Sequence, residues 1–294
     1  MGYRLRRNLT AYLMLLPTII LLGIFTVYPI VESFVISFFK WDMLSAKKPF
    51  VGFQNYRYIF ADPLFHRALI NTLVYVVTFV PILLAVGLLS ALLLNAKIRF
   101  LALFRTAFFV PYVTSLAATG IIWGWIFNDQ FGILNYLLKS VGLQPHDWLN
   151  NPRYTMINIV VLGVWQNLGY VAVIFLAGLQ NVSKDYYEAA DVDGASRSQK
   201  FWRITMPLIS PTTYFLLLLT TIEAFKVFLQ VYVLYGQTPG PNDSGLTLLY
   251  YMFDKGFSDF RMGYASAAAY ILFLIIFLFT LLQMTLSRRV HYEG

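Results

Sequence analysis

The residues with the greatest potential for chemistry lie in two places, and both adjoin long apolar runs. The first is the charged stretch 188–211, which reads EAADVDGASRSQKFWRITMPLISP. The second is a pair of opposite charges, Glu223 and Lys226, inside the apolar run 212–235. An ionisable side chain at the centre of a bilayer costs at least about 2.5–3.5 kcal/mol, so such residues are candidates for function. The elements around both places must explain why charge is kept beside so much apolar chain.

The composition is that of an integral membrane protein. The chain has 294 residues, of which 59% are hydrophobic and 12% charged, whereas soluble domains carry roughly 25% charged residues. Aromatic residues make up 18% of the chain, which suits the belts that form at membrane interfaces. The apolar runs are continuous rather than alternating, so they do not fit a β-barrel. We therefore expect an all-α integral membrane protein.

Six apolar runs are long enough to cross a bilayer core, which takes about 20 residues of helix. They cover about 11–36, 69–94, 104–127, 155–180, 212–235 and 264–286. The first follows a basic flank, but no small-x-small cleavage site comes after it, so we expect a retained span rather than a signal peptide. No separate soluble domain fits between the runs. The chain, 1–294, is therefore predicted to be a single transmembrane domain.

The connections between these runs predict the orientation. Twelve Lys and Arg residues and five acids fall on the side that holds both termini and residues 181–211, against nine and seven on the other side. Because cytoplasmic loops carry the excess of Lys and Arg, both termini and the charged stretch are predicted to be cytoplasmic. The net charge of +8 is then a topology signal, and no nucleic-acid partner is predicted.

The sequence lacks the residues that several kinds of chemistry require. The chain has no cysteine and no G-x-x-x-x-G-K-[ST] phosphate-binding loop. Asp191 and Asp193 could suggest a metal, but no histidine or further acid stands at ligand spacing. We expect no catalytic residue, no metal site and no cofactor held by this chain, and hence no enzyme.

Local signals divide the segment 181–211 into two short helices. Ser183 is predicted to cap the first helix and Gly194 to end it in a left-handed conformation. Ser196 and Gln199 have the spacing of a capping box that opens the second helix. A rigid helix, turn and helix on a cytoplasmic loop suits docking into a groove of a soluble partner.

Two prolines mark the end of this segment. Pro207 is predicted to stop the second helix, and Pro211 to lie in the first turn of the next span. The small side chains of Ala189, Ala190 and Ala195 would let a partner approach the backbone closely.

This stretch resembles the EAA loop of permeases of ATP-binding-cassette (ABC) importers. The matching residues are Glu188, Ala189, Ala190, Asp193, Gly194, Ala195, Phe201, Ile204, Pro207 and Pro211. Met206 departs from the leucine that usually precedes the proline in the family. In that family the loop forms the coupling helix that docks into the ATPase subunit, so the resemblance implies an ATPase-coupling role for these residues.

The resemblance extends to FVGFQNYRYIF, NTLVYVV and YGQTPGPNDSGLTLLYYMF, which look like the carbohydrate-uptake branch of the family. It implies the six-helix bundle of a type I ABC importer permease in the inner membrane of a prokaryote, surrounded by lipid. The implied partners are a second, homologous permease, two ATPase subunits that hold ATP and Mg, and an extracytoplasmic solute-binding protein. The implied cargo is a mono- or oligosaccharide, which ATP hydrolysis in the partner subunits drives into the cytoplasm.

Polar residues inside the spans are candidates for the path of the cargo. These residues are Gln166, Asn167, Tyr170, Glu223, Lys226 and Gln230. Amides and charges can satisfy sugar hydroxyls, while aromatic faces cover the apolar faces of the ring. Glu223 and Lys226, three residues apart, could instead form a structural ion pair, and both readings stay open.

Other cargoes and other transport classes are also alternatives. Glycerol 3-phosphate or another polar solute could take the place of the sugar in the same importer class. An ion-coupled secondary transporter is a further alternative, although it leaves the EAA-like segment without a role.

Overall fold

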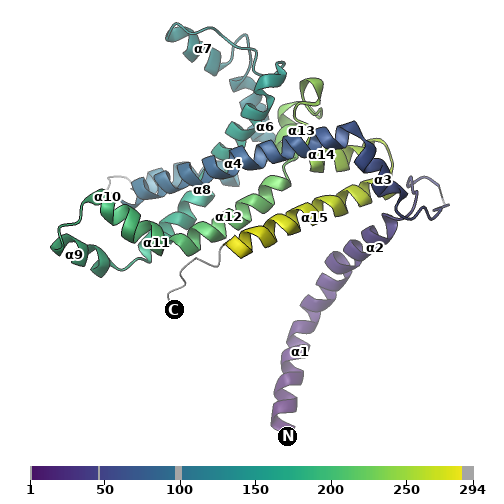
Figure 1. The fold of residues 1–294 in the computed structure, drawn as a ribbon, viewed down its shortest axis with the longest axis horizontal. Coiled ribbons are helices and arrows are strands. Elements are labelled where there is room, and N and C mark those ends of the chain that lie inside the picture. The colour runs from purple at the N-terminus through teal and green to yellow at the C-terminus, as the bar shows by residue number, and fades with distance from the viewer. Residues whose placement is uncertain (1, 46, 97–100, 287–294) are drawn as a thin grey trace. The chain divides into compact units, whose positions relative to one another are not determined.

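The computed structural model describes residues 2–45, 47–96 and 101–286, and these are largely helical (Figure 1). The only β-type pairing in this part of the chain is an isolated bridge between Phe39 and Phe50. The prediction of an all-α protein is confirmed.

The described residues supply four continuous helices that are long and apolar enough to cross a membrane, at Tyr12–Ile36, Pro63–Asn95, Pro152–Gln180 and Met262–Thr285. Two further candidates are helix pairs with a sharp bend between them. Leu101–Val113 and Leu116–Ile126 meet at 102°, and Arg197–Leu208 and Ser210–Phe225 meet at 62°. Counting each bent pair as one span gives up to six, the predicted number, although the last pair covers 197–225 rather than the predicted 212–235.

The chain forms two compact units, and the prediction of a single transmembrane domain stays a prediction. The first unit contains residues 2–63 and 252–273. Its helical elements are α1 (Gly2–Leu22), the π-helix Gly23–Val27, α2 (Tyr28–Ile36), α3 (Gln54–Ala61), the π-helix Asp254–Ser258 and the first part of α15 (Met262–Leu286).

Within this unit α2 packs against the start of α15. The Tyr270 hydroxyl donates a hydrogen bond to the Ile30 carbonyl, and the rings of Phe34 and Tyr270 lie 4.9 Å apart. The Gly263 N–H donates to the Trp41 carbonyl at 3.2 Å. The span Tyr12–Ile36, in contrast, buries none of its most apolar window, so its outer face is left to the surrounding medium.

The second unit holds the remaining described residues, 64–251 and 274–286. Its helices are α4 (Pro63–Asn95), α5 (Leu101–Val113), α6 (Leu116–Ile126), α7 (Ile133–Ser140), α8 (Pro152–Gln180), α9 (Lys184–Val192), α10 (Arg197–Lys200), the π-helix Phe201–Thr205, α11 (Met206–Leu208), α12 (Ser210–Phe225), α13 (Leu229–Leu234), the 3₁₀ turn Pro241–Asp243 and α14 (Leu248–Phe253).

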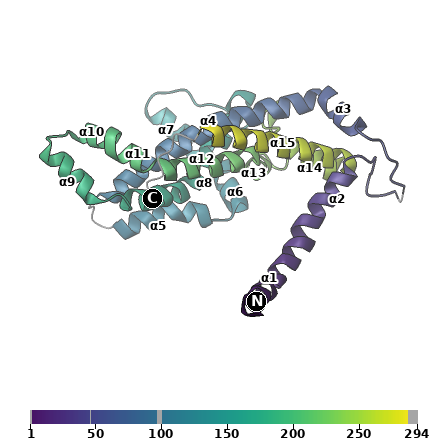
Figure 2. The same ribbon diagram turned by 60° about the horizontal axis from the view of Figure 1, so that its bottom comes forward.

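The long helix α8 is the centre of this unit and packs against α5 and α12 (Figures 1 and 2). Two of its glycines make close contacts, each with a different neighbour. A methyl group on Gly163 would lie 2.6 Å from the Tyr75 hydroxyl of α4, and one on Gly178 would lie 2.6 Å from Thr212 of α12. Small residues at such crossings let helix backbones approach closely, which drives helix association in membranes.

Two of the predicted runs are not continuous helices. The run 104–127 turns at Thr114 and Ser115, between α5 and α6. The run 212–235 is interrupted between Phe225 and Leu229, where Lys226 has φ −94° and ψ 16°. Apolarity alone does not reveal such breaks, because the side chains that satisfy the interrupted backbone come from other parts of the chain.

The α5–α8 crossing yields a test of this packing. A methyl group on Gly169 would lie 2.0 Å from the backbone oxygen of Phe108, whereas one on Gly124 of α6 would meet nothing within 4 Å. Gly169→Ala should therefore destabilise the protein by about 1–3 kcal/mol, the usual cost of overpacking. Gly124→Ala should leave stability unchanged or raise it slightly, because alanine favours helix.

The apparent melting temperature of the purified protein in one detergent measures both effects. Equal melting temperatures for the two variants would contradict the close crossing of α5 and α8.

Candidate functional site

The first half of the charged segment is a short helix with the predicted ends. The Ser183 hydroxyl accepts a hydrogen bond from the Asp185 N–H at 3.3 Å, so Ser183 caps α9. At the other end Gly194 has φ +72°, and the Ala195 N–H donates to the Ala190 carbonyl at 2.9 Å. Because left-handed backbone strains residues with a Cβ, the glycine fixes where α9 ends. Both predictions are confirmed.

The second half opens with the predicted capping box. The Ser196 N–H donates to the Gln199 side chain at 2.7 Å, and the Gln199 N–H donates to the Ser196 hydroxyl at 3.3 Å. The prediction that Pro207 stops this helix is wrong, because the helix continues to Leu208 and breaks at Ile209.

The proline is tolerated because it follows the π-helix Phe201–Thr205. Pro207 is the second residue of α11, and the helix ends two residues later at Ile209. Pro211 lies in the first turn of α12, as predicted.

Two side-chain contacts tie the halves of the segment together. Lys200 Nζ lies 2.6 Å from a carboxylate oxygen of Asp191, and the Tyr187 and Thr205 hydroxyls lie 3.0 Å apart. The Asp191 carboxylate is thus engaged within the protein. The helices and the turn at Gly194 form one braced hairpin at an end of the second unit (Figure 2).

The outer surface of this hairpin combines charge with exposed apolar groups. Glu188, Ala189, Asp193, Gly194 and Pro207 are exposed, whereas Ala190, Ala195, Phe201 and Ile204 are half-buried. Val192 is 89% exposed and Trp202 is 64% exposed. Such side chains are suited to contact another protein surface.

The second unit also contains a cavity of about 500 Å³. Five of the six predicted cargo residues line it, namely Asn167, Tyr170, Glu223, Lys226 and Gln230. Gln166 is not among its lining residues, and its side-chain oxygen is buried with no hydrogen-bond partner. Because Gln166 and Asn167 are neighbours on a helix, their side chains point about 100° apart, so only one can face the cavity.

The break in the run 212–235 places the charged pair at the cavity wall. Lys226 Nζ lies 2.6 Å from a carboxylate oxygen of Glu223, and the two side chains are 43% and 69% exposed. Exposed ion pairs stabilise a fold by only about 0–1 kcal/mol, so this pair adds little to stability. The helix that carries Glu223 ends at Phe225, and the next helix starts at Leu229. Gln230 therefore reaches the same cavity from a different helix.

Aromatic rings also line the cavity. Tyr170 of α8 stacks on Tyr112 of α5 with ring centres 4.9 Å apart and planes 15° apart. Tyr75 and Phe79 of α4 stack at 4.9 Å and also line the cavity. Sequence reasoning missed Tyr112, Tyr75 and Phe79, because nothing in their local sequence separates a cavity ring from a buried or lipid-facing one. The cavity thus joins a charged pair and amides to stacked rings.

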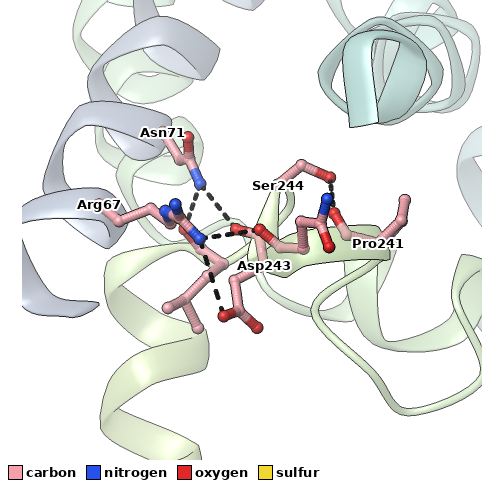
Figure 3. A network of polar contacts seen from close by, with 7 residues as sticks. Arg67, Asn71, Pro241, Asp243 and Ser244 are labelled. Atoms are coloured by element: carbon pink, nitrogen blue, oxygen red, sulfur yellow. Dashed lines mark hydrogen bonds and ion pairs between the residues drawn. The ribbon is translucent and has the colours of Figure 1, made fainter. Parts of the chain in front are cut away.

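A loop held by α4 supports the helix break. Arg67 Nη1 donates to the Asn242 carbonyl at 2.9 Å, and Asn71 donates to the carbonyls of Asp243 and Leu246 at 3.2 and 3.0 Å (Figure 3). Asn242 and Asp243 have positive φ angles of 52° and 54°. These contacts hold the loop in a conformation that residues with a Cβ rarely adopt.

This loop leads directly to the cavity. The Leu248 N–H donates to the Thr72 hydroxyl of α4 at 2.9 Å, which fixes the end of the loop. The neighbouring Thr247 hydroxyl donates to the Val227 carbonyl at 2.6 Å, and both residues are buried. A carbonyl released by the helix break is thereby satisfied, and the wall that carries Lys226 is fixed in place.

The sequence matches one protein family over residues 63–292, the binding-protein-dependent transport system inner membrane components. The chain belongs to this family. The resemblance of the stretch 188–211 to the EAA loop of ABC importer permeases is thus confirmed. The resemblance to the carbohydrate-uptake branch is confirmed by the relatives described next.

Two relatives come from Bacillus subtilis. The permease is 37% identical over 285 residues to the arabinooligosaccharides transport system permease protein AraP. The aligned region covers 96% of this chain and 90% of AraP. It is 38% identical over 291 residues to the probable ABC transporter permease protein YesP, and the aligned region covers 98% of this chain and 93% of YesP.

A solved structure has the same fold. A chain in the crystal structure of a bacterial ABC transporter involved in the import of the acidic polysaccharide alginate superposes with a TM-score of 0.87. The two chains are 26% identical, and the match covers 99% of each. The predicted bundle of a type I ABC importer permease is confirmed.

The support of the helix break can be tested by removing one hydroxyl. Thr247→Val keeps the shape of the side chain but leaves the buried Val227 carbonyl without its donor. An unpaired buried polar group costs about 1–3 kcal/mol, so the apparent melting temperature should fall by several degrees.

The matched control is Thr238→Val. The Thr238 hydroxyl also donates to a backbone carbonyl, that of Tyr235, but Thr238 is exposed and water can replace it. If the two variants melt at the same temperature, the bond from Thr247 does not stabilise the break.

Proposed function

We propose that this protein is the membrane-spanning permease of an ABC importer and that it carries a mono- or oligosaccharide into the cytoplasm. The observation that carries the proposal is the cavity of about 500 Å³, in which the Glu223–Lys226 pair lies among amides and stacked tyrosines. That volume is within the usual range for small-molecule sites, about 300–1,000 Å³.

The chemistry of the lining favours a neutral, hydroxyl-rich cargo. Glu223 and Lys226 are the only charged residues in the described lining, and each neutralises the other. A dianion such as glycerol 3-phosphate would find no excess positive charge there. A sugar could accept from Lys226 and donate to Glu223 through its hydroxyls, while its ring lies against tyrosine. The names of the AraP relative and of the alginate importer also refer to carbohydrates.

The energy would come from partner subunits. In this proposal the hairpin at 181–211 docks into a groove of an ATPase subunit, with Glu188, Ala189 and Gly194 at the contact. Two such subunits hold ATP and Mg, a second homologous permease completes the pathway, and an extracytoplasmic binding protein delivers the sugar. The braced geometry of the hairpin and its exposed Val192 and Trp202 support this role, because a rigid apolar surface can both bind and transmit motion.

The proposed orientation places the hairpin and both termini in the cytoplasm. It is supported by the excess of Lys and Arg in the connections on that side. The loop 236–247, which Arg67 and Asn71 hold, then faces outward, toward the side from which the binding protein would deliver its sugar.

Gly194→Val tests the coupling role. A methyl group on Gly194 would meet nothing within 4 Å, so the variant leaves the packing intact, but the positive φ of 72° strains a β-branched residue by about 1–2 kcal/mol. The hairpin should change shape, and sugar-stimulated ATP hydrolysis by the reconstituted complex should fall at least about tenfold.

Gly142→Val is the matched control, since Gly142 has φ +79° and an equally open surrounding but lies in a loop on the other side of the membrane. Gly194→Asn should retain activity, because asparagine tolerates this conformation. Full ATP hydrolysis with Gly194→Val would contradict the coupling role.

Glu223→Gln tests whether the charged pair serves the cargo. If Glu223 binds a sugar hydroxyl, the loss of a charge-assisted hydrogen bond, worth about 1.5–3 kcal/mol, should lower the uptake rate about tenfold without lowering the melting temperature. Asp259→Asn breaks another ion pair, with Lys255 at 2.8 Å, that lies outside the cavity, and uptake should be unchanged. Normal uptake together with a lower melting temperature for Glu223→Gln would show that the pair is structural.

A further inference from the structure

The first unit has two hollows along the start of α15, one formed with the loop after α2 and with α3 and the other formed with α2 itself, and the proposed transport function uses neither. One has a volume of about 430 Å³ and is lined by residues between 40 and 58 together with Arg261 and Tyr264. The other has a volume of about 360 Å³ and is lined by Pro29, Ile30, Ser33, Ala269, Tyr270 and Phe273. We call them the basic hollow and the apolar groove, and the boundary of α15 that they share the seam.

The basic hollow has an excess of positive charge. Lys40, Lys47 and Arg261 line it, and none of the three takes part in an ion pair within the described residues. Asp42 is the one acid in its lining. One carboxylate oxygen of Asp42 accepts hydrogen bonds from the N–H and the hydroxyl of Ser45, and these bonds hold the pKa of Asp42 below its usual value. The acid is therefore engaged by its own turn, and the cations remain available to an anion.

Aromatic rings accompany these cations. The Arg261 guanidinium lies 4.3 Å from the centre of the Tyr264 ring, and Lys48 Nζ lies 3.8 Å from that of Trp41. Tryptophan and tyrosine beside Lys and Arg are typical of the level of the lipid headgroups. Lys40 comes four residues after the end of α2, and Arg261 directly precedes α15, so the hollow lies where both spans end.

The apolar groove lies further along α15, where α2 forms its other wall. The hydrogen bond from Tyr270 to the Ile30 carbonyl closes the seam at the groove, and the bond from Gly263 to the Trp41 carbonyl closes it at the basic hollow. Because a helix rises about 1.5 Å per residue, Ala269 and Phe273 lie about 12 and 18 Å along α15 from Arg261.

These separations match the depth profile of one bilayer leaflet. A hydrocarbon core of about 30 Å gives each leaflet about 15 Å of acyl chain, with a headgroup layer of roughly 5–8 Å outside it. With the cations at the headgroups, the groove lies among the acyl chains.

We propose that this seam is a binding site for one anionic phospholipid, with the phosphate in the basic hollow and an acyl chain in the apolar groove. A soluble anion or an acidic side chain of a partner protein would use only the hollow. A lipid without net charge would leave its cations without a counter-ion. The combination of the two hollows on one seam therefore favours a lipid that carries both a negative headgroup and acyl chains.

The test measures lipid retention by the purified protein in nanodiscs and by native mass spectrometry. Phosphatidylglycerol should bind in preference to phosphatidylcholine with the same chains. Lys40→Gln combined with Arg261→Gln should weaken phosphatidylglycerol binding about tenfold or more, since each removes a charge-assisted contact. Arg57→Gln is the matched control, because Arg57 is exposed on α3 in the same unit but does not line the hollow, and it should retain wild-type binding.

A second variant tests the groove without touching any charge. Ala269→Phe should fill the groove and weaken phosphatidylglycerol binding, while the weaker binding of inorganic phosphate should be unaffected. Three results would overturn the proposal: equal retention of the two lipids, undiminished phosphatidylglycerol binding by both the double variant and Ala269→Phe, or phosphate binding as tight as that of the lipid. Loss of binding-protein docking by the double variant in lipid-free detergent, with lipid binding unchanged, would assign the hollow to a protein partner instead.

Discussion

The hydrogen bond from the Thr247 hydroxyl to the Val227 carbonyl is the interaction on which the cavity depends. A helix inside a membrane satisfies its own backbone, and any interruption must find donors elsewhere, because the hydrocarbon core supplies none. The break after Phe225 is tolerated since a loop anchored on α4 by Arg67, Asn71 and Thr72 brings Thr247 to it. With the break fixed in this way, Glu223 and Lys226 lie in the wall of the cavity.

The braced hairpin and the cavity lie at the two ends of α12. This helix begins directly after the break at Ile209, where the hairpin ends, and its last turn carries Glu223 beside Lys226. Its 16 residues span about 24 Å, so a rigid helix connects the surface that would meet an ATPase with the wall that would meet the cargo. Gly163 lets α4 pack closely against α8, and Gly178 lets α12 do the same. A displacement of α12 at the hairpin can therefore act on all the cavity walls.

Sequence reasoning succeeded where the signal was local and failed where it depended on distant residues. The caps and the left-handed turn were predicted because each depends only on a few neighbouring residues, namely Ser183, Gly194 and the capping box of Ser196 with Gln199. The six apolar runs were found for the same reason. The break after Phe225 was missed, since its support comes from Thr247, and the Tyr112–Tyr170 stack was missed because α5 and α8 meet only in the folded bundle.

The proposed function implies that ATP in the partner subunits moves the hairpin and thereby opens the cavity beside Glu223 to alternate sides of the membrane. Because the chain has no cysteine, Gln230→Cys places a single reactive thiol in the cavity wall. The most direct measurement is its rate of labelling by a membrane-impermeant maleimide in proteoliposomes that contain the whole complex. The thiol should react from the cytoplasmic side without nucleotide, and from the outer side with ATP and loaded binding protein. A labelling rate from each side that does not change with ATP would contradict the account.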